Sequence, residues 1–136
     1  MVKPKIKPIG EAPNLQILKD TFGVSETDTI ISYGDAVYCP ADGMSSDLLV
    51  HELKHCERQG WTENSARRWW ERYMESKDFR LEEERIAYQA QYNFCKTVYS
   101  DRNKLNAIRI ALAKELASPR YGNLVTQSEA LELIQK

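Results

Sequence analysis

The chain has 136 residues, of which 42% are hydrophobic and 29% are charged, close to the composition of soluble globular domains, so extensive disorder is excluded. The net charge of −1 argues against a general electrostatic attraction to nucleic acid or to an anionic membrane. No apolar run reaches the roughly 18 residues that span a bilayer, and the first residues do not resemble a secretory signal. We expect one domain over residues 1–136 in the cytoplasm, where three widely spaced cysteines stay reduced.

The first third of the chain predicts a small sheet and one helix. Lysines alternate with apolar residues and prolines in residues 1–12, which predicts an extended arm or an edge strand. Residues 14–22 form an amphipathic helical pattern that ends at Gly23. Residues 27–40 are the best β region, and the Gly34-Asp35 pair in their middle predicts a hairpin turn.

The pattern becomes helical from Ser45 onward. Capping residues and apolar periodicity predict five helices. They cover residues 47–59, a stretch that begins after Thr62 and contains the letters RRWWERY, residues 79–99, residues 102–116, and a short helix that Thr126 and Glu129 begin. The sequence therefore predicts an α+β fold with a little sheet followed by helices.

Residues 51–55 read His-Glu-Leu-Lys-His, the H-E-x-x-H pattern. Because residues i and i+4 share a helix face, His51 and His55 can direct imidazole nitrogens at one point, as two ligands of a tetrahedral zinc ion do. Glu52 is rotated by about 100° around the helix axis, so it can accept a proton from a zinc-bound water without binding the metal. These are the only two histidines in the chain. The competing interpretation is a helix with two incidental histidines.

A catalytic zinc site takes a third protein ligand, and here it must be a carboxylate or a cysteine. Glu82, Glu83 and Glu84 begin the longest predicted helix, where glutamates are also common as solvated side chains. Glu83 and Glu84 each share a stripe with apolar residues, so periodicity disfavours Glu82 and leaves the other two open. Cys39 and Cys95 are weaker candidates, because free cysteine is commonly a small buried hydrophobe.

HELKH followed about thirty residues later by Glu84-Arg-Ile-Ala-Tyr88 resembles the metal site of gluzincins, the zincins with a glutamate as third ligand. The wider sequence resembles a group of short, phage-encoded predicted metallopeptidase-like proteins. This likeness covers most of residues 28–122, in the stretches ISYGDAVYCP, LLVHELKH, WWERYMESKDFRLEEERIAYQAQYNF and SPRYG.

The resemblance implies a minimal zincin-like domain in which Zn²⁺ is bound by His51, His55 and Glu84, with Glu52 as general base and a peptide or protein as substrate. The chain is shorter than larger gluzincins and has no obvious second lobe. An alternative is therefore a phage structural, assembly or virion protein that keeps the zincin scaffold with a structural or vestigial metal site. A third interpretation is a peptide-binding module without turnover.

In zincins generally a strand at the rim of the site pairs with the substrate, and Val37 and Tyr38 are the candidates here. An edge strand offers unpaired backbone groups, whereas the alternative is a strand buried within the sheet. Tyr121 and Tyr88 are candidate oxyanion stabilisers, with Tyr73 and Arg120 as further ones.

Trp69 and Trp70 stand among several arginines, a combination that nucleic-acid contacts also use. The net charge gives that interpretation no support, so we expect one tryptophan in the core and the arginines in water.

Overall fold

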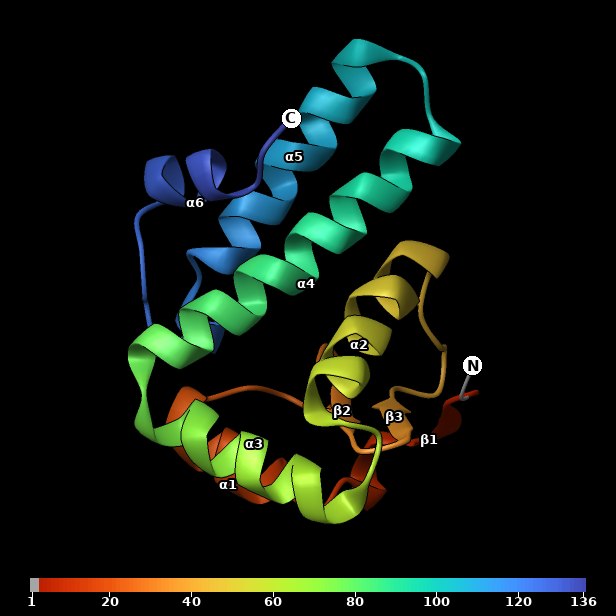
Figure 1. Cartoon of the computed structure of the whole chain (residues 1–136), viewed down its shortest axis with the longest axis vertical. Coiled ribbons are helices and arrows are strands. Elements are labelled where there is room, and N and C mark those ends of the chain that lie inside the picture. The colour runs from red at the N-terminus through yellow and green to blue at the C-terminus, as the bar shows by residue number, and fades with distance from the viewer. Residues whose placement is uncertain (1–2) are drawn as a thin grey trace.

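The computed structural model describes residues 3–136 and has an α+β architecture, as the sequence predicts (Figure 1). Residues 1 and 2 of the predicted arm lie outside the described residues. The elements in chain order are β1 (Lys5–Pro8), the 3-10 turn η1 (Ile9–Glu11), α1 (Leu15–Phe22), β2 (Ile31–Tyr33), β3 (Ala36–Cys39), α2 (Ser46–Gln59), α3 (Glu63–Glu75), α4 (Lys77–Val98), α5 (Arg102–Leu116), the 3-10 turn η2 (Pro119–Tyr121) and α6 (Gln127–Leu133).

The three strands form one mixed sheet in the order β1-β3-β2. The predicted hairpin is confirmed: β2 pairs antiparallel with β3 across a turn in which Gly34 has a φ of 66°. The predicted strand near the N-terminus is also confirmed as an edge, because β1 pairs only with β3, in parallel. Only residues 31–33 of the β pattern before the turn are strand, since residues 25–30 form turns and irregular backbone.

The expectation that Val37 and Tyr38 lie on a rim strand is wrong. β3 is the central strand and pairs on both sides, so its backbone groups are already used in the sheet. All four of its residues are buried. The free edge nearest α2 belongs to β2 instead, whose contacts with that helix place it beside the histidine motif.

The helix boundaries follow the capping residues. Gly23 and Gly60 both end helices in the left-handed conformation, with φ values of 68° and 87°. Thr62 and Thr126 each begin a helix through a capping box. The long helix α4 begins at residue 77 rather than 79, because the Ser76 side chain accepts a hydrogen bond from the Phe79 amide and so caps the extra turn.

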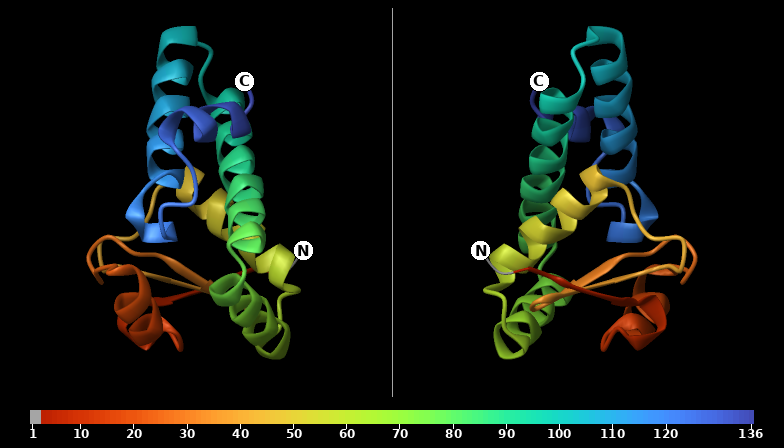
Figure 2. Two further views of the ribbon diagram at one scale, coloured as in Figure 1. Left: turned by 90° about the vertical axis from the view of Figure 1, so that its left-hand side faces the viewer. Right: turned by 90° about the vertical axis from the view of Figure 1, so that its right-hand side faces the viewer.

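Two hydrophobic clusters divide the core. One joins the sheet to α1 and η1, with Leu15, Leu18 and Ile31 among its buried members. The other joins α4, α5 and α6, with Leu116 and Ile134 among its buried members. Side views show α4 and α5 rising above the sheet, with α2 crossing between the two layers (Figure 2). The helix that carries the histidine motif therefore lies at the boundary between the clusters, in contact with β2 and with α4. Along residues 3–136, no helix combines the length and apolarity needed to cross a membrane.

Candidate metal centre

The two histidines of α2 and one glutamate of α4 converge on a single point. The Nε2 atoms of His51 and His55 lie 3.2 Å and 3.1 Å from the same carboxylate oxygen, Glu84 Oε1. The three residues are 3%, 5% and 3% exposed, so water does not screen their interaction. The sequence-predicted pairing of two imidazoles with a distant acid is therefore present in the fold.

The spacing of these atoms suits a metal ion. Ligands about 2.0–2.1 Å from a tetrahedral zinc ion lie about 3.3 Å from one another, close to the imidazole–carboxylate distances found here. Ligand atoms of His51, Glu52 and His55 also lie within 4.8 Å of one another. This buried group could hold a metal ion.

Glu52 lies beside the two histidines and is held by a different partner, Ser32. The hydroxyl of Ser32 on β2 donates to Glu52 Oε1 at 2.8 Å and also lies 2.9 Å from the Glu52 carbonyl oxygen. Burial raises the pKa of the Glu52 carboxyl, which brings it closer to the working range of a general base. No sequence pattern indicates Ser32, because its role depends on how β2 packs against α2.

A hydrogen-bonded chain orients His51. Its Nδ1 lies 3.0 Å from Gln91 Oε1, and Gln91 Nε2 donates to Asp47 Oδ2 at 2.8 Å. An amide oxygen can only accept, so His51 Nδ1 carries a proton, and Nε2 is the nitrogen that faces Glu84 and could bind a metal. Gln91 lies seven residues after Glu84 on α4, two turns along the same helix face, and this spacing could have identified it.

The second oxygen of Glu84 is also bound. Tyr73 on α3 donates its hydroxyl proton to Glu84 Oε2 at 2.7 Å. Tyr73 is therefore already engaged in orienting Glu84, which disfavours it among the oxyanion candidates. Burial alone would raise the pKa of Glu84, but the imidazoles of His55 and His51 outweigh burial and hold that pKa well below its usual range. Burial alone would lower the pKa of His55, yet the Glu84 carboxylate raises it to about 9.

The structure separates the two glutamates that periodicity left open. Glu83 points away from the histidines and accepts hydrogen bonds from Trp69 Nε1 at 2.8 Å and from Arg58 at 2.8 Å and 3.1 Å. It is therefore a buried structural acceptor that links α2, α3 and α4. Glu82 is exposed and pairs with Arg85 on its own helix, as its place outside the apolar stripe predicts.

A pocket of about 360 Å³ opens beside the converging groups, and all three tyrosines predicted as oxyanion candidates, Tyr73, Tyr88 and Tyr121, line it. The Tyr88 ring meets the His51 ring edge-on with centroids 4.4 Å apart. Its hydroxyl oxygen lies 2.6 Å from that of Tyr121, which comes from the turn η2. One hydroxyl must donate to the other, which leaves the second proton of the pair free to turn toward the pocket. Arg120 lines the same pocket.

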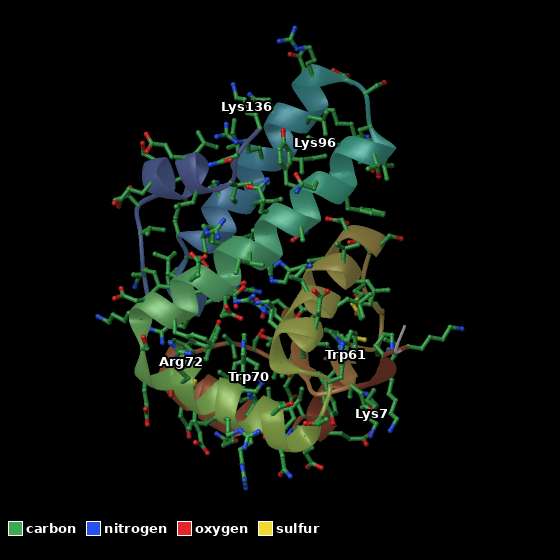
Figure 3. All side chains as sticks on the ribbon, viewed as in Figure 1. Lys7, Trp61, Trp70, Arg72, Lys96 and Lys136 are labelled. Carbon is green, nitrogen blue, oxygen red and sulfur yellow. The ribbon has the colours of Figure 1, made fainter. Side chains whose placement is uncertain are left out.

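One tryptophan lies in the core and the neighbouring arginines lie in water, as expected. Trp69 is buried, while the arginines beside it on α3 are exposed. Figure 3 shows Trp70 rising from α3 toward the space below α2, where its Nε1 donates to the Ser32 carbonyl at 3.0 Å. Both indole groups thus use their N–H in the protein interior. The three cysteines are also buried, and among the described residues neither Cys39 nor Cys95 joins the metal-binding group.

Comparison with models of protein families, with curated proteins and with solved structures finds no match to this chain. The site must therefore be interpreted from its own geometry.

Proposed function

We propose that this protein is a zinc-dependent peptidase of the zincin type. The observation that carries the proposal is the convergence of His51 Nε2, His55 Nε2 and Glu84 Oε1 at 3.1–3.2 Å beside a pocket. These residues would hold the zinc ion, because imidazole and carboxylate in this number and spacing are zinc donors. Two histidines that were incidental on their helix would not meet a common buried acid from another element.

The residues around the donors have complementary tasks. When bound, zinc would supply Lewis-acid chemistry, which would lower the pKa of a water and polarise the carbonyl to be cleaved. Glu52, fixed by Ser32, accepts the proton of the attacking water and passes it to the departing amine nitrogen as the C–N bond breaks. Tyr88 and Tyr121 place a free hydroxyl proton at the pocket, where it can stabilise the negative oxygen of the tetrahedral transition state.

The test is metal analysis of protein purified without a histidine tag, together with the variant Glu52→Gln. We expect about one zinc per chain in both proteins, and a loss of peptide hydrolysis of about 10²-fold or more in the variant, since general-base catalysis contributes at least this much. The amide keeps the shape of the side chain and cannot accept the proton. A wild-type protein without stoichiometric metal would refute the proposal.

A second candidate is a structural or assembly protein in which the metal only stabilises the fold. Burial favours it, because Glu52 is 7% exposed and the three donors are more buried still. Metal binding would then contribute directly to folding. In this case Glu52→Gln leaves biological function intact, while His51→Ala unfolds the protein. Under either candidate we expect a protein or peptide as partner, and the phage context and the cytoplasmic location stay predictions.

A further inference from the structure

The pocket beside the proposed metal centre has an apolar inner part and a charged mouth. Its apolar lining includes Leu18, Phe22, Ile31 and Trp70, which come from α1, β2 and α3. Its mouth carries Asp28, Glu115 and Arg120, whose side chains are 63%, 53% and 32% exposed. A volume of about 360 Å³ is at the small end for ligand pockets, so it suits one or two residues of a peptide rather than a long segment.

The sheet edge at the pocket is closed to a long extended substrate. The carbonyl of Ser32 on β2 accepts hydrogen bonds from Gln59 Nε2 at 2.9 Å and from Trp70 Nε1 at 3.0 Å. A carbonyl oxygen has two lone pairs, so these two side chains fill its capacity and no substrate N–H can pair there. A substrate that continues along β2 would also meet the Trp70 indole. The site therefore favours the end of a peptide chain over its middle.

Arg120 is the cation at this mouth. Its nitrogens lie 3.7 Å from Asp28 Oδ2 and 3.6 Å from Glu115 Oε2, both beyond the length of a hydrogen bond. Both carboxylates are more exposed than the guanidinium, and exposed pairs of this kind bind weakly. Its backbone is fixed, because the buried Arg80 donates to the carbonyl of the next residue, Tyr121, at 2.9 Å. A guanidinium on a held backbone, with only long ion-pair contacts, suits a carboxylate, which it can bind through two parallel hydrogen bonds.

Resting on the proposed peptidase function, we propose that the substrate is the carboxyl-terminal end of a peptide with an apolar last residue. The apolar side chain enters the inner pocket, and the terminal carboxylate binds Arg120 at the mouth. Water adds to the last peptide carbonyl and the C–N bond breaks. The oxygen of the water stays on the new carboxylate of the shortened peptide, and its two protons pass to the amino group of the released amino acid. The chain thus acts as a carboxypeptidase that removes an apolar residue from the carboxyl terminus of a peptide.

Binding to the Glu52→Gln protein tests this inference without turnover. The probes are acetyl-Ala-Leu, with a free carboxylate, and acetyl-Ala-Leu-amide, measured by isothermal titration calorimetry. We expect the free acid to bind about tenfold or more tightly, since one charge-assisted pair separates the two probes. Adding Arg120→Met should reduce this ratio to near one, and Arg120→Lys should retain part of it. Arg102→Met is the matched control: Arg102 lines a separate hollow with Lys96 and Lys136, which Figure 3 labels at the far end of the molecule.

Three results would overturn the inference: equal affinity for the two probes, a ratio that Arg120→Met leaves unchanged, or tighter binding of Ala-Leu-amide. The last would mean that Asp28 and Glu115 bind a peptide amino terminus instead. Wild-type hydrolysis is scored separately. Equal cleavage of the acid and the amide would refute the inference and leave the peptidase proposal standing. An acid preference in binding with no cleavage of acetyl-Ala-Leu would support the carboxylate site and refute the peptidase proposal.

Discussion

The residue with the clearest supporting role at the proposed metal centre is Gln91, which forms a hydrogen bond to the ligand candidate His51. Its amide oxygen fixes the proton on His51 Nδ1, and its amide nitrogen is fixed in turn by Asp47. Gln91 is 2% exposed, so its hydrogen bond to His51 is shielded from water, while Asp47 at the other end is half-buried. Groups that hold the far nitrogen of a ligating histidine keep the ring oriented and its lone pair available.

We therefore expect Gln91→Leu to weaken zinc binding by about 10- to 100-fold, the range found when such orienting partners are lost. The leucine fills the same space but leaves His51 free to rotate and to change tautomer. Competition with a chromophoric chelator measures the affinity. Asn93→Leu, two residues along α4 at an exposed position, is the control and should bind zinc as the wild type does. Equal affinity in Gln91→Leu would mean that the hydrogen bond does not orient the ligand.

At the scale of elements, the turn between β2 and β3 connects the sheet to α3. Gly34 has a positive φ, and a Cβ added there would lie 3.1 Å from the backbone carbon and oxygen of Thr62, the residue that caps α3. The Gly34 amide also donates to Gln59 Oε1 at 2.7 Å, near the end of α2. One glycine therefore lets the hairpin approach two helices closely.

Gly34→Ala should lower the free energy of unfolding by about 1–3 kcal/mol, because it adds backbone strain at a positive φ and crowds the start of α3. Urea titration followed by circular dichroism measures the change. Gly10→Ala is the matched control, since nothing lies within 4 Å of a Cβ at that position and its φ is not positive. A Gly34→Ala protein as stable as the control would show that the turn can shift away from Thr62.

How much of these elements the sequence predicts depends on whether the signal is local. Thr62, Gly60 and Thr126 act on their own neighbours, so the helix ends they mark could be predicted. The central position of β3 could not, because it depends on β1 pairing in parallel across some thirty residues of chain. Periodicity finds which residues are buried but not what they touch, which is why it could not separate Glu83 from Glu84.

Across the whole molecule, buried thiols lie on three different elements. Cys39 is on β3, Cys56 on α2 and Cys95 on α4, and each is 6% exposed or less. Burial raises the pKa of all three thiols, that of Cys56 to about 12. Thiolates are the reactive form. Burial therefore protects these groups in the folded state in two ways, because it keeps reagents out and disfavours ionisation.

We expect none of the three thiols to react with Ellman's reagent at pH 8 within minutes, and all three to react after unfolding in urea. Each reacting thiol forms a mixed disulfide and releases one thionitrobenzoate, and its absorbance counts the reacted thiols in both states. If one thiol reacts quickly in native buffer while the other two do not, the helix or strand that carries it opens independently of the rest.

The position of the candidate centre between two hydrophobic clusters has an evolutionary consequence. Its donors belong to neither cluster, so mutations that repack the sheet against α1, or α5 against α6, need not alter the chemistry. Lineages could exchange most interior side chains on either side and still keep the same ligand triangle, provided that α2 and α4 remain in register. Distant homologues of this chain would then share a few polar residues and little other sequence similarity.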